Sequence, residues 1–299
     1  MDSYDTKYGR ISGIKTFETY ADGTLKDCTI CNKIQLNTKY GLLTPQYEYA
    51  SVRKKYTSSV AFYPDGNISR ISLNEQTEIN TPFGIIPAEL ITFYKNGNIK
   101  RLFPLNGKLS AYWDENEEYG LAKEYFFNMP FGEIKTKLMG ISFYENGNVK
   151  DLTLWPKDKI SLSTPLGIQT ARIGFSLYAN GNIKSFEPLF PIEIVTSIGP
   201  VKAFDVTALG LSGDKNSLNF KEKGELESLI TSTTKIIVKD KSEKTHVYSP
   251  EYVEDTGESG IFIKPLLVEF NQNTVKFNGT DEYEINNNSF ITETVKFSD

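Results

Sequence analysis

The stretch that decides the fold is "SFYENGNVKDL", residues 142–152. Closely similar strings occur at 61–71 ("AFYPDGNISRI"), 92–102 ("TFYKNGNIKRL") and 176–186 ("SLYANGNIKSF"). In each string, Asn-Gly or Asp-Gly stands between apolar residues, which is the strongest short signal for a β-hairpin because glycine tolerates positive φ. The turn glycines, including a first copy and a degenerate sixth copy, are Gly23, Gly66, Gly97, Gly147, Gly181 and Gly224. They are 43, 31, 50, 34 and 43 residues apart, and such recurrence predicts an array of similar supersecondary units.

The strings also predict a strand register. If the glycine is position 0 and the loop consists of positions −1 and 0 in a type I′ turn, position −3 faces +2 and position −6 faces +5. Tyr94 would then face Ile99, and Ile91 would face Leu102. Such pairs contribute roughly 0.2–1 kcal/mol each. We expect positions −6, −4 and +5 in the main core, and the tyrosine at −3 with the aliphatic residue at +2 on the opposite face.

A second motif alternates with the first. It reads "INTPFGIIPA" at 79–88 and "LSTPLGIQT" at 162–170, with related strings at 36–45, 128–134 and, weakly, 195–202. Thr-Pro-x-Gly suits a tight turn, because Pro presets φ and Gly accepts a positive φ. We therefore predict an all-β fold, an elongated repeat array of antiparallel β-hairpins that forms a coiled meander or a β-solenoid-like sheet. The Asn-Gly turns would line one edge and the Thr-Pro-x-Gly turns the other, with little helix.

The repeat weakens toward the C-terminus. We predict a β-hairpin repeat array at 1–213 and a degenerate or capping β region at 214–299, continuous with the first. Strands are expected in the second region at "TKIIVK", "IFIKPLLVEF" and "NTVKF". The long interval between Gly97 and Gly147 holds an insertion at 106–125, in which 105–109 suggests a partial hairpin and "DENEE" (114–118) an acidic loop.

Composition restricts the class of protein. The chain has 299 residues, a net charge of −5 and 39% hydrophobic residues, as expected for a soluble globular protein. The acidic balance argues against nucleic acid as a partner. The N-terminus lacks the apolar core of a signal peptide, and no apolar run reaches the length of a transmembrane helix. We therefore expect no transmembrane segment and a cytoplasmic location.

Few residues are candidates for catalysis or metal binding. Cys28 and Cys31 form a C-x-x-C, but the chain has no other cysteine and a single histidine, His246, so a zinc site is not expected. Cys28 aligns with core positions of the other copies. His246 is expected to be a surface or strand residue. Motifs for nucleotide binding or nucleophilic catalysis are absent from the sequence, so we predict no catalytic residue, cofactor or metal. Only the three-dimensional structure could reveal a pair of carboxylates for a hydrolase.

The half-motifs "FYKNGNIK" and "FYENGNVK" resemble MORN-type repeats of bacterial proteins. The resemblance covers the turn regions within about residues 14–230. It implies a hairpin array used for protein or membrane-surface contacts, with no catalytic residues. The same strings are also slightly similar to the aromatic-Gly hairpins of cell-wall-binding repeats.

The candidate binding residues are the tyrosines at position −3, which we call the Tyr stripe: Tyr20, Tyr63, Tyr94, Tyr144 and Tyr178. They either pack across strands to support the turns or form an exposed aromatic ladder, since aromatic residues are favoured at interfaces. The leading interpretation is a non-enzymatic binding or scaffold protein that presents a repeat β surface to a protein partner. The alternatives are a carbohydrate or cell-wall binding module that uses the Tyr stripe, and an unrecognised hydrolase.

Overall fold

The computed structural model describes residues 2–208, 213, 215–254 and 261–295. In these ranges nearly all regular structure is antiparallel β-strand, which confirms the predicted all-β fold. The chain forms two compact units, the first from Met1–Phe127 and Lys137–Trp155, the second from Asn128–Thr136 and Pro156–Asp299. The predicted boundary after residue 213 falls among residues 209–214, most of which lie outside the described ranges, and it stays a prediction. No helix in the described ranges is long and apolar enough to cross a membrane.

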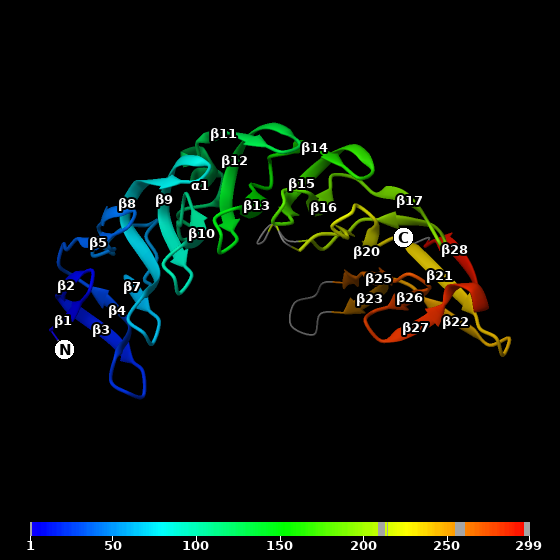
Figure 1. The fold of residues 1–299 in the computed structure, drawn as a ribbon, viewed down its shortest axis with the longest axis horizontal. Coiled ribbons are helices and arrows are strands. Elements are labelled where there is room, and N and C mark those ends of the chain that lie inside the picture. Colours follow the sequence, from blue (N-terminus) through cyan, green and yellow to red (C-terminus); the bar gives the residue numbers. More distant parts are fainter. Residues whose placement is uncertain (1, 209–212, 214, 255–260, 296–299) are drawn as a thin grey trace. The chain divides into compact units, whose positions relative to one another are not determined.

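Unit 1 is built on one antiparallel ladder with the strand order β3-β4-β7-β8-β9-β10-β12-β13 (Figure 1). The elements that lie in this unit or enter it are β1 (Ser3–Thr6), β2 (Gly9–Ser12), β3 (Ile14–Thr19), β4 (Leu25–Ile30), β5 (Leu36–Thr38), β6 (Gly41–Leu43), β7 (Val60–Phe62), β8 (Ile68–Thr81), β9 (Gly84–Phe93), β10 (Ile99–Phe103), α1 (Glu115–Leu121), β11 (Glu124–Met129), β12 (Gly132–Phe143) and β13 (Val149–Leu154). The pairs β1–β2 and β5–β6 form separate hairpins.

Unit 2 has a corresponding ladder with the order β14-β15-β16-β19-β20-β25-β26-β27. Its elements are β14 (Ile160–Thr164), β15 (Gly167–Leu177), β16 (Ile183–Pro188), β17 (Ile192–Thr196), β18 (Gly199–Ala203), β19 (Leu218–Phe220), β20 (Leu226–Thr231), β21 (Thr234–Lys239), β22 (Thr245–Tyr248), β23 (Glu251–Glu254), β24 (Ile261–Lys264), β25 (Leu266–Phe270), β26 (Thr274–Phe277), β27 (Asp281–Glu284), the 3-10 turn η1 (Ile285–Asn287) and β28 (Ser289–Thr294). The strands predicted at "TKIIVK", "IFIKPLLVEF" and "NTVKF" are confirmed as β21, β24 with β25, and β26.

The Asn-Gly turns fold the chain back as predicted, but with a three-residue loop. Tyr94 N donates to Asn98 O at 2.8 Å, and Gly97 N donates to Tyr94 O at 2.9 Å. Gly97 has φ of 78°, whereas Asn96 is not among the residues with positive φ. The predicted type I′ turn is therefore wrong, and the loop is the alternative hairpin loop that ends in a left-handed glycine and a bulge. The Asn96 side chain selects it, because its Oδ1 accepts from Asn98 N at 2.8 Å.

This loop changes half of the predicted register. Position −4 faces +2, as in Phe93 with Ile99, so the predicted pairing of −3 with +2 is wrong. A register shift at +3 follows, and it restores the predicted pairing of −6 with +5, as in Ile91 with Leu102. The bulge also turns the +2 residue into the core: Ile99 is 4% exposed, although we predicted it on the opposite face with the tyrosine.

The second class of turn, which we call the Thr-Gly turns, closes two-residue loops at Gly9, Gly41, Gly84, Gly132, Gly167 and Gly199. At Gly84, Thr81 Oγ1 accepts from Phe83 N at 3.1 Å and donates to Gly84 O at 2.8 Å. The same pair of bonds recurs at Thr6, Thr38, Thr164 and Thr196. The threonine therefore fixes five of these turns, including the one at Gly9 that was not predicted, whereas the turn at Gly132 has Met129 in its place.

The two classes of turn lie against each other, so the prediction that they line opposite edges is wrong. The strands β8 and β9 pair in two stretches, which are separated by a register shift between Ser72 and Thr77. The second stretch, Thr77–Thr81 with Gly84–Ala88, ends in the Thr-Gly turn. Tyr8 Oη accepts from Ile68 N and Tyr40 Oη from Ile99 N. Where a Thr-Gly turn contains proline, the proline ring lies against the glycine of the Asn-Gly turn, so closely that a Cβ on that glycine would contact the ring. The pairs are Pro82–Gly147, Pro130–Gly181 and Pro165–Gly224.

The contacts follow one rule in each unit. Every Thr-Gly turn except that at Gly199 contacts not the next Asn-Gly turn along the chain but the one after it, as in Gly9 with Gly66 and Gly132 with Gly181. Gly199 lies against Thr292 of β28 instead. Apolar side chains of the ladder strands are fully buried, among them Ile71, Ile79, Ile91 and Phe175. The interleaved hairpins thus share a continuous core within each unit.

One further turn has the same geometry without glycine. Asp240 N donates to Lys244 O and Glu243 N donates to Asp240 O, both at 2.9 Å, as in the Asn-Gly turns. Glu243 occupies the glycine position with φ of 64°. The chain therefore contains a further copy of the turn that lacks the Asn-Gly motif.

We predict that Glu243→Gly stabilises the protein by roughly 0.5–1 kcal/mol, because it removes left-handed strain at a small entropic cost. The exposed ion pair of Glu243 with Lys239 contributes little against this. Urea unfolding of the two proteins measures the change. As the opposite control, Gly97→Ala is expected to destabilise the protein, because alanine disfavours a φ of 78°. The added Cβ would contact no other atom, so the effect would come from the backbone conformation alone. A Glu243→Gly protein less stable than the parent would contradict the assignment.

Candidate functional site

The Tyr stripe is half-buried, and its hydroxyls join consecutive hairpins. Tyr63 Oη donates to Phe93 O at 2.7 Å, and Tyr94 Oη donates to Phe143 O at 2.9 Å. The same bond joins Tyr20 to Phe62 at 2.8 Å and Tyr178 to Phe220 at 2.7 Å. Tyr144 occupies the corresponding position and is half-buried. The polar end of the ring is therefore used inside the fold.

Burial raises the pKa of the phenols of Tyr63, Tyr94 and Tyr144. These rings support the turns, as one of the two interpretations of the stripe required. They are not fully buried, so contact of the stripe with a partner stays a prediction.

The second asparagine of Asn-Gly-Asn also joins neighbouring hairpins. Asn98 Nδ2 donates to Glu145 O at 2.7 Å, and Asn182 Nδ2 donates to Glu222 O at 3.2 Å. On its other side, Asn98 Oδ1 accepts from the Lys39 ammonium of a Thr-Gly turn. The recurrence of this residue has a structural cause and needs no ligand.

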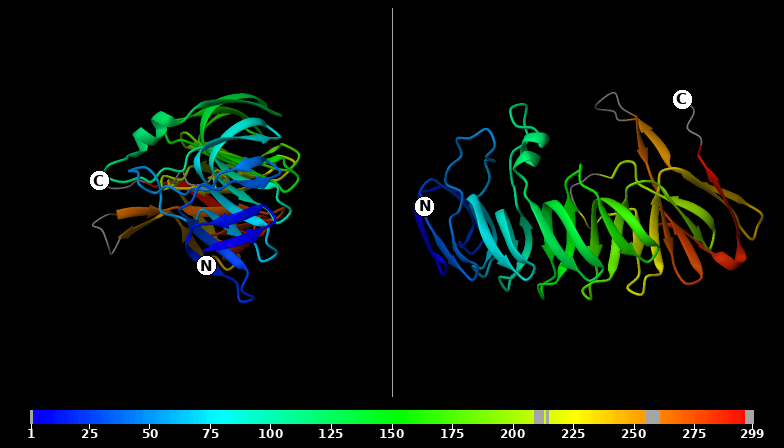
Figure 2. Two further views of the ribbon diagram at one scale, coloured as in Figure 1. Left: turned by 90° about the vertical axis from the view of Figure 1, so that its left-hand side faces the viewer. Right: turned by 90° about the horizontal axis from the view of Figure 1, so that it is seen from above.

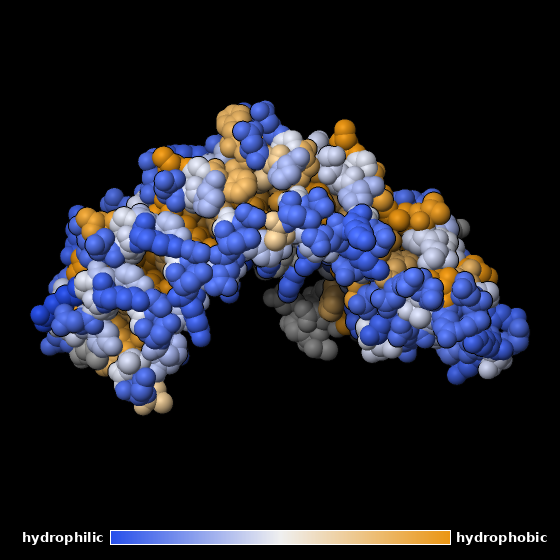
Figure 3. Space-filling model, viewed as in Figure 1, coloured by the Kyte–Doolittle hydropathy of each residue, from blue (hydrophilic) through white to orange (hydrophobic). Residues whose placement is uncertain are grey.

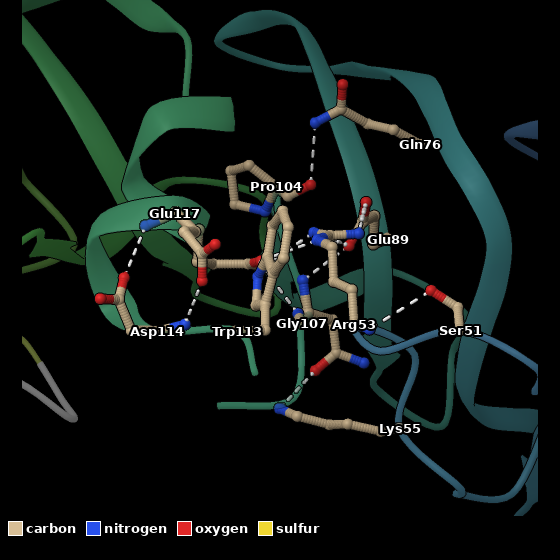
Figure 4. Close-up of polar contacts among 12 residues, drawn as sticks. Ser51, Arg53, Lys55, Gln76, Glu89, Pro104, Gly107, Trp113, Asp114 and Glu117 are labelled. Carbon is tan, nitrogen blue, oxygen red and sulfur yellow. Dashed lines mark hydrogen bonds and ion pairs between the residues drawn. The ribbon is translucent and has the colours of Figure 1, made fainter. Parts of the chain in front are cut away.

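A different part of unit 1 carries a buried charged cluster, shown in Figure 4. Arg53 binds two carboxylates at once. Its Nη1 and Nη2 donate to Glu89 at 2.8 and 2.7 Å, and its Nε and Nη2 donate to Glu118 at 2.7 and 2.8 Å. Trp113 Nε1 adds a bond to Glu118 Oε2 at 2.7 Å, and Gly107 N adds one to Glu118 Oε1 at 2.7 Å. We call these residues the Arg53 cluster.

The electrostatics of the Arg53 cluster are those of a structural ion network. Glu118 is only 3% exposed, and burial opposes its ionisation, but the bonds from Arg53 and Trp113 keep its pKa below the ordinary value. A glycosidase acid needs a carboxyl with a raised pKa facing a second carboxylate. Here one guanidinium binds both carboxylates and the pKa of Glu118 is lowered, so the cluster is not the pair that the hydrolase alternative requires.

The Arg53 cluster fastens two irregular segments to the ladder. Arg53 lies in the loop 44–59 between β6 and β7, and Glu118 lies in α1 within the segment 104–123 after β10. Lys108 N donates to Arg53 O at 2.6 Å, and Lys55 Nζ donates to Asn106 Oδ1 at 3.1 Å. Figure 2 shows both segments extending from the same side of the unit 1 strands. We call the two segments together the loop platform.

Residues 114–118 form the start of α1, so their prediction as a loop is wrong. Asp114 Oδ1 accepts from Glu117 N at 2.9 Å, and Glu117 Oε2 accepts from Asp114 N at 2.7 Å, which is a capping box. The partial hairpin expected at 105–109 is also replaced, by a bridge between Ser110 and Trp113.

The loop platform exposes large apolar side chains. Tyr112 is 82% exposed and Tyr56 is 70% exposed. Val52, Leu109 and Leu121 are between 47% and 59% exposed. The side chains that hold the platform are thus buried, while neighbouring apolar side chains face outward.

Elsewhere, the remaining candidates are structural. Cys28 is fully buried at a core position, as its alignment predicted, and burial raises the pKa of its thiol to about 12. His246 lies in β22 as a half-buried strand residue, and its Nε2 is 2.9 Å from Asp240 Oδ2. Within the described ranges, no group of three or more His, Cys, Asp or Glu side chains is placed to hold a metal ion.

Comparison with models of known protein families finds no match to this chain. Comparison with curated proteins finds no significant relative.

We predict that Tyr94→Phe destabilises the protein by about 1 kcal/mol, because the Phe143 carbonyl loses its hydroxyl donor. Urea unfolding measures this difference. Tyr112→Phe is the matched control. Because the Tyr112 side chain is 82% exposed, loss of its hydroxyl should change the free energy of unfolding little. Equal stabilities of Tyr94→Phe and the parent would refute a structural role for the stripe hydroxyls.

We also predict that Glu118→Gln destabilises the protein by about 3 kcal/mol, the low end for a broken buried pair, because Arg53 keeps Glu89. Glu115→Gln, on the exposed face of the same helix, should leave the stability unchanged. Since the folded pKa of Glu118 is depressed, its contribution is complete above the ordinary value of 4.5 and is lost as pH falls through the folded pKa. Unfolding free energies measured between about pH 7 and about pH 3 should therefore converge for parent and Glu118→Gln at acid pH.

Proposed function

We propose that the chain is a non-enzymatic binding protein that holds a protein partner on its loop platform, with the interleaved β-hairpins as the scaffold. The observation that carries the proposal is the contrast within the platform. A buried network of Arg53, Glu89, Glu118 and Trp113 fixes two irregular segments, and the same segments leave Tyr112, Tyr56 and their apolar neighbours facing outward.

The platform adds no strand to the ladder. Beyond the isolated bridge of Pro45 with Leu73, the loop 44–59 is joined to β4, β8 and β9 by single backbone and side-chain hydrogen bonds. Long loops of this kind in compact proteins are usually functional. A loop that serves only as a connection would not require four hydrogen bonds from one guanidinium to keep its shape.

The chemistry of the platform suits a protein partner. Tyrosine presents a large contact area with few rotatable bonds, and aromatic residues are enriched at the centres of interfaces. Because the Arg53 cluster fixes the segments beforehand, binding would cost less ordering entropy than it costs for a mobile loop.

On the face shown in Figure 3, hydrophobic patches are small and separated by hydrophilic side chains. The Tyr stripe gives less support to the glycan alternative, because its hydroxyls already bond to backbone carbonyls.

We predict that the double variant Leu109→Ser with Tyr112→Ser loses its partner. A photo-crosslinking residue placed at Val52 of the parent should capture one specific protein from a lysate of the cells that express the chain, identified by mass spectrometry. With that protein purified, the double variant should bind it at least tenfold more weakly, as expected for lost aromatic and apolar contacts at an interface.

The matched control is Ile168→Ser, which removes a side chain 79% exposed in unit 2 and should leave the affinity unchanged. Unchanged stability of the double variant in urea would show that the platform stays folded. Equal binding by the parent and the double variant would refute the platform as the contact surface.

A further inference from the structure

A cleft of about 220 Å³ lies in unit 1, apart from the loop platform, between two consecutive Thr-Gly turns and the Asn-Gly turns they contact. Its lining includes Tyr8, Lys39, Tyr40, Asn67, Phe93 and Asn96. A cleft of about 330 Å³ occupies the equivalent place in unit 2, between the turns at Pro130, Pro165, Gly181 and Gly224. The cleft is therefore a product of the way the hairpins interleave, and its side chains differ between the units.

The unit 1 cleft is formed by two copies of the same tetrapeptide, Thr-Lys-Tyr-Gly, at 6–9 and 38–41. In each copy the lysine ammonium lies over the ring of the following tyrosine, 5.4 Å from the centroid at Lys7 and 5.2 Å at Lys39. The Tyr40 ring stacks on Phe93, with the centroids 5.9 Å apart. The cleft thus has rigid aromatic walls and a cation at its side.

Asn96 supplies a hydrogen-bond donor to this cleft. Its Oδ1 is used within the turn, where it accepts from Asn98 N at 2.8 Å. Its Nδ2 makes none of the side-chain hydrogen bonds found among the described residues, and the residue is exposed at the cleft. The charge at the cleft is positive, because Lys39 lines it and no carboxylate is among its lining residues, while Lys7 and Lys95 lie near Asp65. In a chain of net charge −5, this is a place that attracts an anion.

We propose that the unit 1 cleft binds an acidic sugar residue, a pyranose that carries a carboxylate. The carboxylate would accept from the Lys39 ammonium and from Asn96 Nδ2, and the apolar face of the ring would lie along the phenol rings of Tyr8 and Tyr40. Aromatic walls with a few placed polar groups are typical of small-ligand sites, and the cleft is of the size of a single small ring.

The unit 2 cleft provides an internal comparison. In its Thr-Gly turns proline stands in place of the lysine, with Phe131 and Leu166 in place of the two tyrosines, and Glu222 and Lys223 lie at its edge. It keeps one aromatic side chain, Phe131, but lacks the excess positive charge of the unit 1 cleft, so the acidic sugar should bind only in unit 1.

The test uses tetragalacturonate as the probe in isothermal titration calorimetry with the full chain at low salt. The neutral control is the same tetrasaccharide with every carboxylate methyl-esterified, and hexaglutamate tests an acidic peptide in its place. We expect binding of tetragalacturonate that weakens with added salt, and no binding of the ester or of the peptide.

Two pairs of variants locate the site. Lys39→Ala should weaken binding roughly tenfold or more, whereas Lys7→Ala, in the other copy of the tetrapeptide, should weaken it less than about threefold. Asn96→Asp keeps the turn, because aspartate occupies this position at Asp22 and Asp65, but it replaces the donor by a second anion and should abolish binding. Asn146→Asp makes the same change in a turn outside the cleft and should leave the affinity unchanged.

Loss of binding in Lys39→Ala and Asn96→Asp, with retention in both control variants, supports the proposal. Absence of binding by the parent, equal binding of the ester or of hexaglutamate, or equal effects of Asn96→Asp and Asn146→Asp would overturn it. None of these outcomes bears on the loop platform, which shares no residue with the cleft.

Discussion

A left-handed glycine at the end of a three-residue loop is the constraint on which this structure depends. At Gly97 and its equivalents, φ lies near 80–90°, a conformation that L-residues avoid. The loop places a bulge after the turn, and the bulge turns the +2 aliphatic residue into the core beside the residue at −4. It also leaves the Tyr94 ring free to reach the Phe143 carbonyl of the following hairpin. Core packing and the junction between hairpins thus have the same origin.

The sequence predicted the all-β fold and the pairing of −6 with +5, because apolar residues at a fixed distance from Asn-Gly carry that information. It did not predict the turn type, because Asn-Gly suits both loops and the choice is made by the side chain of Asn96 on the backbone of Asn98. It also failed to place the two classes of turn side by side. In β8 and β9 that contact depends on the register shift between Ser72 and Thr77, which the local residue types do not predict.

In the sequence, the loop platform is visible only as longer spacings between turn glycines. A Thr-Gly glycine precedes the next Asn-Gly glycine by 13 residues from Gly84 to Gly97, but by 25 from Gly41 to Gly66. The following interval is 18 residues from Gly66 to Gly84, but 35 from Gly97 to Gly132. Both excess lengths were readable as insertions. Their mutual attachment was not, because Arg53 finds its two carboxylates 36 and 65 residues away and nothing local marks those glutamates.

The contact that every Thr-Gly turn except that at Gly199 makes with the second Asn-Gly turn ahead has a consequence for synthesis on the ribosome. The partner glycine follows 49 residues later for Gly132 and 63 residues later for Gly84. At a translation rate of about 5–20 residues per second, a newly made turn waits several seconds for its neighbour. The growing chain from Gly9 to Gly224 therefore always carries one or two Thr-Gly turns without their partners, and these contacts form in order along the chain.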